Sequence, residues 1–219
     1  MVLDLAVERA VGFVVVPDSD CKIALDRSDS KITITVPGKP HLLSAELGRL
    51  NAARLLRDVT GDFDARVSVA GVFHPAGKST VKEYVYAYHG AGILLWQDEE
   101  NYVRLEIAAD LQHGKPRPYA NFEYRKFGVL AASKGLKIED GSSYLRLRRR
   151  GDMIYAAFGP DGFRWTSFPS LSASLSDRLS VGFSAINTAT KTLSAQLEGL
   201  EITECAGASA GATGAATGP

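Results

Sequence analysis

The sequence of 219 residues contains little cysteine and little methionine, with two of each, and no excess of charge of either sign. Lysine and arginine together number 25, and so do aspartate and glutamate. A balanced chain has no overall field that attracts a polyanion or an acidic membrane surface. We therefore expect neither a nucleic-acid partner nor a membrane partner.

Long apolar runs are also missing. No stretch approaches the ~18 consecutive apolar residues that a membrane-spanning helix needs. The short apolar run at residues 11–16 follows Asp4 and Glu8 and has no basic leader before it, so we expect no signal peptide and a cytoplasmic location. In a reducing compartment Cys21 and Cys205 are expected to be thiols. A disulfide that joins the first strand to the last is the alternative.

The chain has no convincing long helical pattern but many short alternating segments. In residues 102–107, apolar side chains alternate strictly with polar or aromatic ones, which predicts a strand with one buried face. Roughly a dozen such segments, separated by turn signals every 8–12 residues or so, predict an all-β sandwich or barrel. We assign residues 12–205 to this sandwich, residues 1–11 to an extension or linker remnant, and the Ala/Gly-rich residues 206–219 to a disordered tail.

The central strands can be aligned by their pattern alone. We expect residues 83–89 to be extended, residues 90–107 to form a hairpin with an acidic turn, and residues 110–118 to be a long loop that leads to a further strand. A simple antiparallel register then places Glu106 beside Asn121. The same register places Arg104 beside Glu123 and Tyr102 beside Arg125.

Several short motifs together resemble a known family. They are LSAELGR at 43–49, GDF at 61–63, GAGILLWQD at 90–98, NYVRL at 101–105, LRLRR at 145–149, and PDG at 160–162 with Trp165. The chain, over roughly residues 12–203, resembles bacterial proteins of the domain-of-unknown-function family 1349 in the concanavalin A-like lectin/glucanase superfamily. The resemblance implies a jelly-roll sandwich of two antiparallel sheets, one of them concave. Similar domains accompany glycoside hydrolases or bacterial signalling domains, and the family has no agreed activity.

The polar face of the central strands is the candidate site. Sugars need flat aromatic surface for their C–H faces and polar groups for their hydroxyls. The aromatic and polar side chains of this face together supply both, and Tyr119 is one of the aromatic ones. We predict that ten others bind a ligand: Tyr86, Tyr88, His89, Trp96, Tyr102, Arg104, Glu106, Asn121, Glu123 and Arg125. The function that follows is a non-catalytic, lectin-like module for an oligosaccharide or glycan. A solvated sheet face with ion pairs of ~0.2–1 kcal/mol each is the simpler interpretation.

Two other functions stay open. One is a structural or protein-interaction domain of a bacterial signalling protein, with a protein partner. The other is a glycoside hydrolase that uses Glu106 and Glu123, but Arg104 and Arg125 should hold both carboxylates ionised, whereas a general acid must be protonated. We therefore predict no catalytic residues.

Metal and cofactor motifs are absent from the pattern. The four histidines are dispersed with no pair at metal-ligand spacing, and Asp18 with Asp20 supplies too few oxygens for calcium. We expect no metal site and no cofactor.

Overall fold

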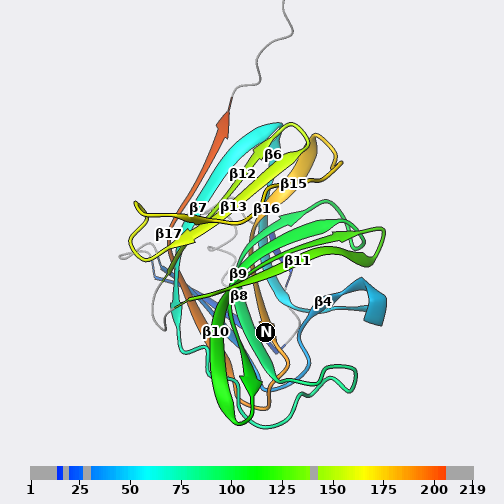
Figure 1. Ribbon diagram of the computed structural model, residues 1–219, viewed down its shortest axis with the longest axis vertical. Helices are drawn as coiled ribbons and strands as arrows, with labels where there is room; N and C mark the ends of the chain where they lie inside the picture. The colour runs from blue at the N-terminus through cyan, green and yellow to red at the C-terminus, as the bar shows by residue number, and fades with distance from the viewer. Residues whose placement is uncertain (1–13, 17–19, 27–30, 139–142, 206–219) are drawn as a thin grey trace, which may run out of the picture.

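The computed structural model describes residues 14–16, 20–26, 31–138 and 143–205, which form two large antiparallel sheets packed face to face (Figure 1). The predicted extension at 1–11 and the predicted tail at 206–219 lie outside the described residues, so those assignments stay predictions.

The first large sheet has seven strands in the order β1-β6-β16-β8-β9-β10-β11. Every neighbouring pair in it is antiparallel. Its strands are β1 (Val14–Val16), β6 (Ala53–Thr60), β8 (Tyr88–Trp96), β9 (Tyr102–Gln112), β10 (Lys115–Lys126), β11 (Val129–Lys137) and β16 (Arg178–Asn187).

The second large sheet has eight strands, with the order β14-β13-β12-β7-β17-β3-β2 and β15 paired to β13. Its strands are β2 (Lys22–Asp26), β3 (Lys31–Val36), β7 (Asp62–Gly71), β12 (Ser143–Arg150), β13 (Met153–Gly159), β14 (Thr166–Ser167), β15 (Leu171–Ser172) and β17 (Leu193–Cys205). A small pair, β4 (Leu43–Ser44) and β5 (Arg49–Leu50), flanks the 3-10 turn η1 (Ala45–Leu47). None of the described segments is a helix long and apolar enough to cross a membrane.

The hydrophobic core lies between the two large sheets. Alternate side chains of each strand point into it, because successive side chains of a strand face opposite sides. On β9 these are Val103, Leu105 and Ile107, and on β7 they include Phe63 and Val67, all of them buried. The prediction of an all-β jelly-roll sandwich is confirmed. Cys21 is buried in this core, whereas the side chain of Cys205 is outside the description, so the disulfide alternative stays untested.

The predicted loop at residues 110–118 is wrong. Strands β9 and β10 continue to a two-residue turn at His113 and Gly114, whose φ angles of 49° and 76° suit a tight hairpin turn. Pro116 and Pro118 do not break β10, because its pairing with β11 begins only at Tyr119. Both prolines therefore lie on an open strand edge, where a missing N–H costs no ladder hydrogen bond.

The face of the seven-stranded sheet that points away from the core, the outer face, is covered over its central strands, whereas β11 at the sheet edge is exposed. Residues 40–52 and 79–87, the covering segments, lie over it and build a second hydrophobic cluster. Leu42, Leu43 and Val81 come from these segments, and Leu94 and Tyr102 come from the sheet below. The simpler interpretation, a solvated face, is wrong for the central strands, because these apolar side chains exclude water from the polar ones beside them.

The predicted strand at residues 83–89 is also wrong over most of its length. β8 begins only at Tyr88, and the preceding residues turn instead, with the Tyr84 N–H donating to the Val81 carbonyl at 3.1 Å. The turn brings Val81 and Tyr84 down onto the second cluster. Burial of these side chains outweighs the β propensity of the tyrosine-rich segment.

Candidate functional site

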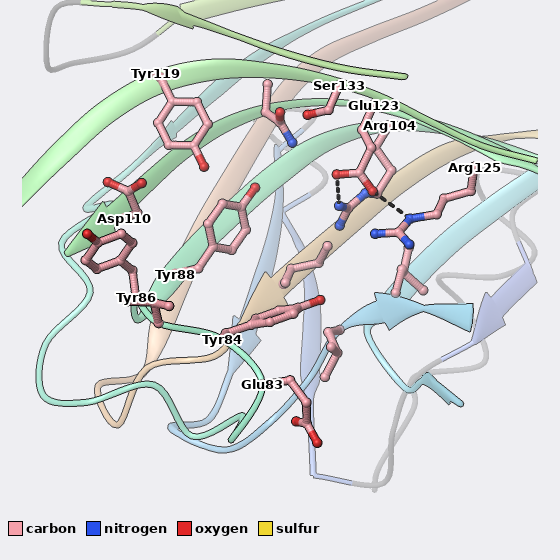
Figure 2. A pocket seen from close by; sticks show the side chains of 15 residues that line it. Glu83, Tyr84, Tyr86, Tyr88, Arg104, Asp110, Tyr119, Glu123, Arg125 and Ser133 are labelled. Atoms are coloured by element: carbon pink, nitrogen blue, oxygen red, sulfur yellow. Dashed lines mark hydrogen bonds and ion pairs between the residues drawn. The ribbon is translucent and has the colours of Figure 1, made fainter. Parts of the chain in front are cut away.

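A pocket of about 360 Å³ opens on the outer face, between the central strands and the covering segments. Its floor comes from β8, β9 and β10, and its rim comes from residues 42–43 and 83–86 (Figure 2). Of the predicted ligand-binding side chains, the pocket lining contains Tyr86, Tyr88, Arg104, Asn121, Glu123 and Arg125.

Tyrosines occupy one end of this pocket. Figure 2 shows Tyr86, Tyr88 and Tyr119 together there, with Tyr84 on the rim. The rings of Tyr88 and Tyr119 lie 6.4 Å apart and are tilted by 60°. Tyr86 is the most accessible of the tyrosines at the pocket, with 39% of its surface exposed. An apolar ring at the mouth of a polar pocket is suited to the C–H face of a sugar.

The position of Tyr88 depends on a glycine. A Cβ atom placed on Gly90 would lie 2.5 Å from the Tyr88 hydroxyl and 2.7 Å from the ring, so the tyrosine lies across the space that this glycine leaves. The hydroxyl then donates a 2.8 Å hydrogen bond to Oε2 of Glu106. Gly90 is thus explained by packing on the outer face.

The other end of the pocket is charged. The predicted register is confirmed, with Arg104 paired to Glu123, Tyr102 to Arg125 and Glu106 to Asn121. Arg104 donates from Nη2 to Oε2 of Glu123 at 2.6 Å, and Arg125 donates from Nε to Oε1 of the same carboxylate at 2.9 Å. All three side chains are buried. The guanidinium groups are therefore held rigidly at the pocket wall, as the dashed lines in Figure 2 show.

The two glutamates have opposite electrostatics. Desolvation raises the pKa of Glu123, but the charges and hydrogen bonds of Arg104 and Arg125 together outweigh it, so the net pKa is lowered. For Glu106 desolvation also dominates, and the charge of Arg104 with hydrogen bonds from Tyr88 and Asn121 only partly offsets it, so the pKa is raised. The arginines thus do not lower the pKa of Glu106 as expected, because desolvation outweighs the charge of Arg104, whose Nη1 lies 3.7 Å from Oε1.

Some polar atoms at this end lack a hydrogen-bonding partner within the described parts of the chain. They include Nε of Arg104 and Oε1 of Glu106. Buried polar groups are normally satisfied by protein, water or ligand. The Arg104 side chain, which lines the pocket, thus keeps a donor that its two carboxylate partners do not use.

The remaining predicted residues lie elsewhere. His89 points to the opposite face of β8, where its Nε2 lies 3.1 Å from the Lys191 carbonyl, and desolvation lowers its pKa to about 4. Trp96 stacks on Tyr102 with ring centroids 5.2 Å apart, and Arg54 covers the indole at 4.5 Å. Glu106 is fully buried beneath the lining. Strand alternation explains His89, packing in the second cluster explains Trp96 and Tyr102, and Tyr88 lies against Glu106.

Several lining residues are not in the predicted set. Asp110 lies on β9 opposite Tyr88, and Arg117 holds its carboxylate with two hydrogen bonds of 3.1 and 2.7 Å. Glu83 and Tyr84 come from a covering segment, and Ser133 comes from β11. A prediction that extended the hairpin strands through residues 110–118 would have placed Asp110 on β9 beside the site. No local pattern marks the covering segments.

The arrangement suits binding better than acid–base chemistry. Glu123 is ionised and neutralised by two arginines, and Glu106 carries the raised pKa of a general acid but does not line the pocket. A catalytic acid must reach the bond that it protonates. The pocket therefore presents fixed hydrogen-bonding groups and aromatic rings, and the carboxyl with the raised pKa is not among the residues that line it.

Comparison with known proteins identifies the fold. No family model matches the sequence, so the resemblance to family 1349 stays a prediction, and no curated protein matches either. A functionally unknown protein from Saccharomyces cerevisiae superposes with a TM-score of 0.71 at 14% identity, over 89% of this chain and 97% of that chain.

Two further structures share the sandwich. A xylan beta-1,4-xylosidase from Bacillus halodurans C-125 gives a TM-score of 0.57 at 13% identity, with 78% of this chain matched to 33% of that enzyme. The CBM2 module of the evolved Dit of Lactobacillus casei BL23 phage J-1 gives 0.55 at 7% identity, over 88% of this chain and 89% of that chain. The chain spans about a third of the xylosidase. These likenesses establish a jelly-roll sandwich that occurs both alone and as part of a larger enzyme.

Proposed function

We propose that this protein is a non-catalytic recognition module that binds an oligosaccharide or glycan in the pocket on the outer face. The observation that carries the proposal is the pairing of chemistries in one cavity. Exposed Tyr86 and partly buried Tyr88 and Tyr119 lie at one end, and the Arg104–Glu123–Arg125 network lies at the other. Sugar recognition needs both kinds of group, and the volume of about 360 Å³ lies within the size range of small-molecule sites.

Rigidity supports the same conclusion. The ion pairs of Glu123 fix both guanidinium groups, and Arg117 fixes Asp110, before any ligand arrives. A preformed site loses little conformational entropy on binding. The fold adds support, since a CBM2 module and a segment of a xylosidase have similar sandwiches. We also propose that the chain is related to family 1349 and that it has no nucleic-acid or membrane partner.

The proposal is tested by oligosaccharide binding to matched tyrosine variants. The purified chain is screened on a glycan array and then titrated calorimetrically with each oligosaccharide that binds. We expect Tyr86→Ala to weaken the affinity about tenfold, which corresponds to ~1.4 kcal/mol of lost contact. Tyr155→Ala is the control, because Tyr155 is equally exposed, at 37% against 39%, but lies on β13 of the other sheet.

The outcomes separate the alternatives. No binding by any oligosaccharide at millimolar concentration would overturn the proposal. Binding that Tyr86→Ala and Tyr155→Ala weaken equally would place the ligand elsewhere. Self-association or capture of a protein partner, without sugar binding, would support the structural or protein-interaction alternative. Release of reducing sugar from the bound oligosaccharide would support a glycoside hydrolase.

A further inference from the structure

A second cluster of polar side chains lies away from the pocket, at an end of the sandwich. Asp20 and Cys21 directly precede β2, and His41 lies between β3 and β4. His41 is anchored to the end of β16 by two backbone hydrogen bonds of 2.9 Å with Asn187. Cys21 and His41 are buried, and Asp20 is partly exposed. One atom from each side chain, a sulfur, a nitrogen and an oxygen, lies within 4.8 Å of the other two.

The hydrogen bonds of His41 constrain its protonation. Its Nδ1 lies 3.1 Å from the Lys39 carbonyl oxygen, which can only accept, so Nδ1 carries a proton. In a neutral imidazole Nε2 is then also an acceptor, yet it lies 2.8 Å from Oδ1 of Asp20. Two acceptors at this distance repel each other unless a cation lies between them. A proton on the ring or on the carboxyl fits this 2.8 Å contact as it stands, and a metal ion could take its place once the two atoms move apart.

The donor set favours a metal ion. Thiolate, imidazole and carboxylate are the ligands of zinc in proteins, whereas calcium and magnesium take oxygen ligands. Metal-binding histidines commonly donate the other ring N–H to a carbonyl, as His41 does to Lys39. One thiolate and one carboxylate would offset the two positive charges of the ion, and the Lys39 ammonium beside Asp20 would leave the cluster with one positive charge. Lys39 binds the second oxygen of Asp20 at 2.8 Å and leaves Oδ1 directed at His41.

We propose that Asp20, Cys21 and His41 bind a zinc ion, with a further coordination position left for water or another donor. Zinc–ligand bonds of about 2.0–2.3 Å require ligand atoms roughly 3.3–3.8 Å apart, so Nε2 of His41 and Oδ1 of Asp20, which lie 2.8 Å apart, must separate by about 0.5 Å or more around the ion. The ion would join the start of β2 to the segment that enters β4. Because Leu42 and Leu43 follow His41 directly and line the pocket, it would also hold one wall of that pocket.

Cobalt(II) is the probe that reports the ligands directly. The chain is treated with a chelator, the chelator is removed, and CoCl₂ is added while the absorption spectrum is recorded. We expect a thiolate-to-cobalt band in the near ultraviolet and intense visible bands of a tetrahedral ion, both abolished by ZnCl₂ in excess. Cys21→Ser should remove the near-ultraviolet band. Cys205→Ser is the matched control, since these are the only two cysteines, and it should leave the band unchanged.

Zinc affinity is then measured by calorimetry. Asp20→Asn changes a partly exposed side chain and keeps the shape of the residue, so it tests the site even if Cys21→Ser alters the core. Loss of a residue that only hydrogen-bonds to a metal ligand weakens metal binding about tenfold or more. We therefore expect Asp20→Asn, which changes a ligand itself, to weaken zinc binding at least about tenfold, and Cys21→Ser to weaken it further. Absence of zinc binding by the chelator-treated chain would overturn the proposal and identify the His41–Asp20 contact as an ion pair. Equal affinity in wild type and Cys21→Ser would overturn it as well.

Discussion

Replacing Glu123 by glutamine removes the buried negative charge that two arginines share. Its carboxylate accepts from Arg104 at 2.6 Å and from Arg125 at 2.9 Å, and only 7% of the residue is exposed. Glutamine keeps the size and shape of the side chain. The substitution therefore leaves the packing intact but leaves two buried cations without their common partner.

The cost follows from what each arginine retains. Breaking a buried ion pair by removing one partner destabilises a protein by about 3–5 kcal/mol. Arg104 still has Glu106 at 3.7 Å, and Arg125 still has the partly exposed Glu46 at 2.9 Å. These residual partners place the expected loss at the lower end, about 3 kcal/mol.

Urea unfolding followed by tryptophan fluorescence measures this loss. With a slope of about 3 kcal/mol per molar urea, the midpoint should fall by about 1 M. Asp58→Asn is the matched control, because Asp58 also accepts from an arginine, Arg178, at 2.6 Å, but both side chains are exposed. Its midpoint should not move measurably. Equal shifts for the two variants would refute the reasoning that burial decides the strength of these pairs.

Three further predictions concern the same face. The cost of Glu123→Gln should shrink as the pH falls below about 4.5, because the lowered pKa of Glu123 stabilises the fold only while the carboxyl is ionised. For Glu106, whose pKa is raised, the stability of wild type relative to Glu106→Gln should instead fall as the pH rises above about 4.5; urea midpoints between pH 3 and pH 8 test both slopes. Gly90→Ala should displace Tyr88 and cost about 1–3 kcal/mol in a thermal melt, whereas Gly151→Ala, at a turn φ of 54° that strains alanine, should lower stability by about 1 kcal/mol without disturbing the pocket.

Much of the sandwich follows from local pattern. The alternation in β9 identifies Val103, Leu105 and Ile107 as core residues, because a strand has a side-chain period of two. The same period aligns Arg104 with Glu123 across the hairpin. Each of these predictions depends only on neighbouring residues or on strands joined by a short connection.

The burial of the outer face did not follow from local pattern. The covering segments have no strong periodicity, and contacts with Leu94 and Ile186 on the distant strands β8 and β16 decide their position. The raised pKa of Glu106 depends on this burial. The sequence shows only the nearby arginines, whose charges by themselves would lower that pKa. The prolines of β10 likewise indicated a loop, because the sequence does not show where the neighbouring β11 ends.

The cluster of Asp20, Cys21 and His41 illustrates the same limit. Its cysteine and histidine are twenty positions apart in the sequence, which is not a metal-ligand spacing. They meet because the bridge between His41 and Asn187 brings the segment after β3 to the edge of the sandwich where Cys21 enters β2. Only the tertiary fold brings these donors together.

Tyrosine-selective NMR during an oligosaccharide titration tests the proposed binding pocket most directly. The chain has eight tyrosines, and they are spread over both sheets and the covering segments, so their ring signals locate a ligand without further labelling. We predict that the ligand shifts the signals of Tyr84, Tyr86, Tyr88 and Tyr119, which line the pocket, and leaves Tyr144 and Tyr155 unchanged. Shifts confined to Tyr144 and Tyr155, or no shifts with any oligosaccharide, would contradict sugar recognition in this pocket.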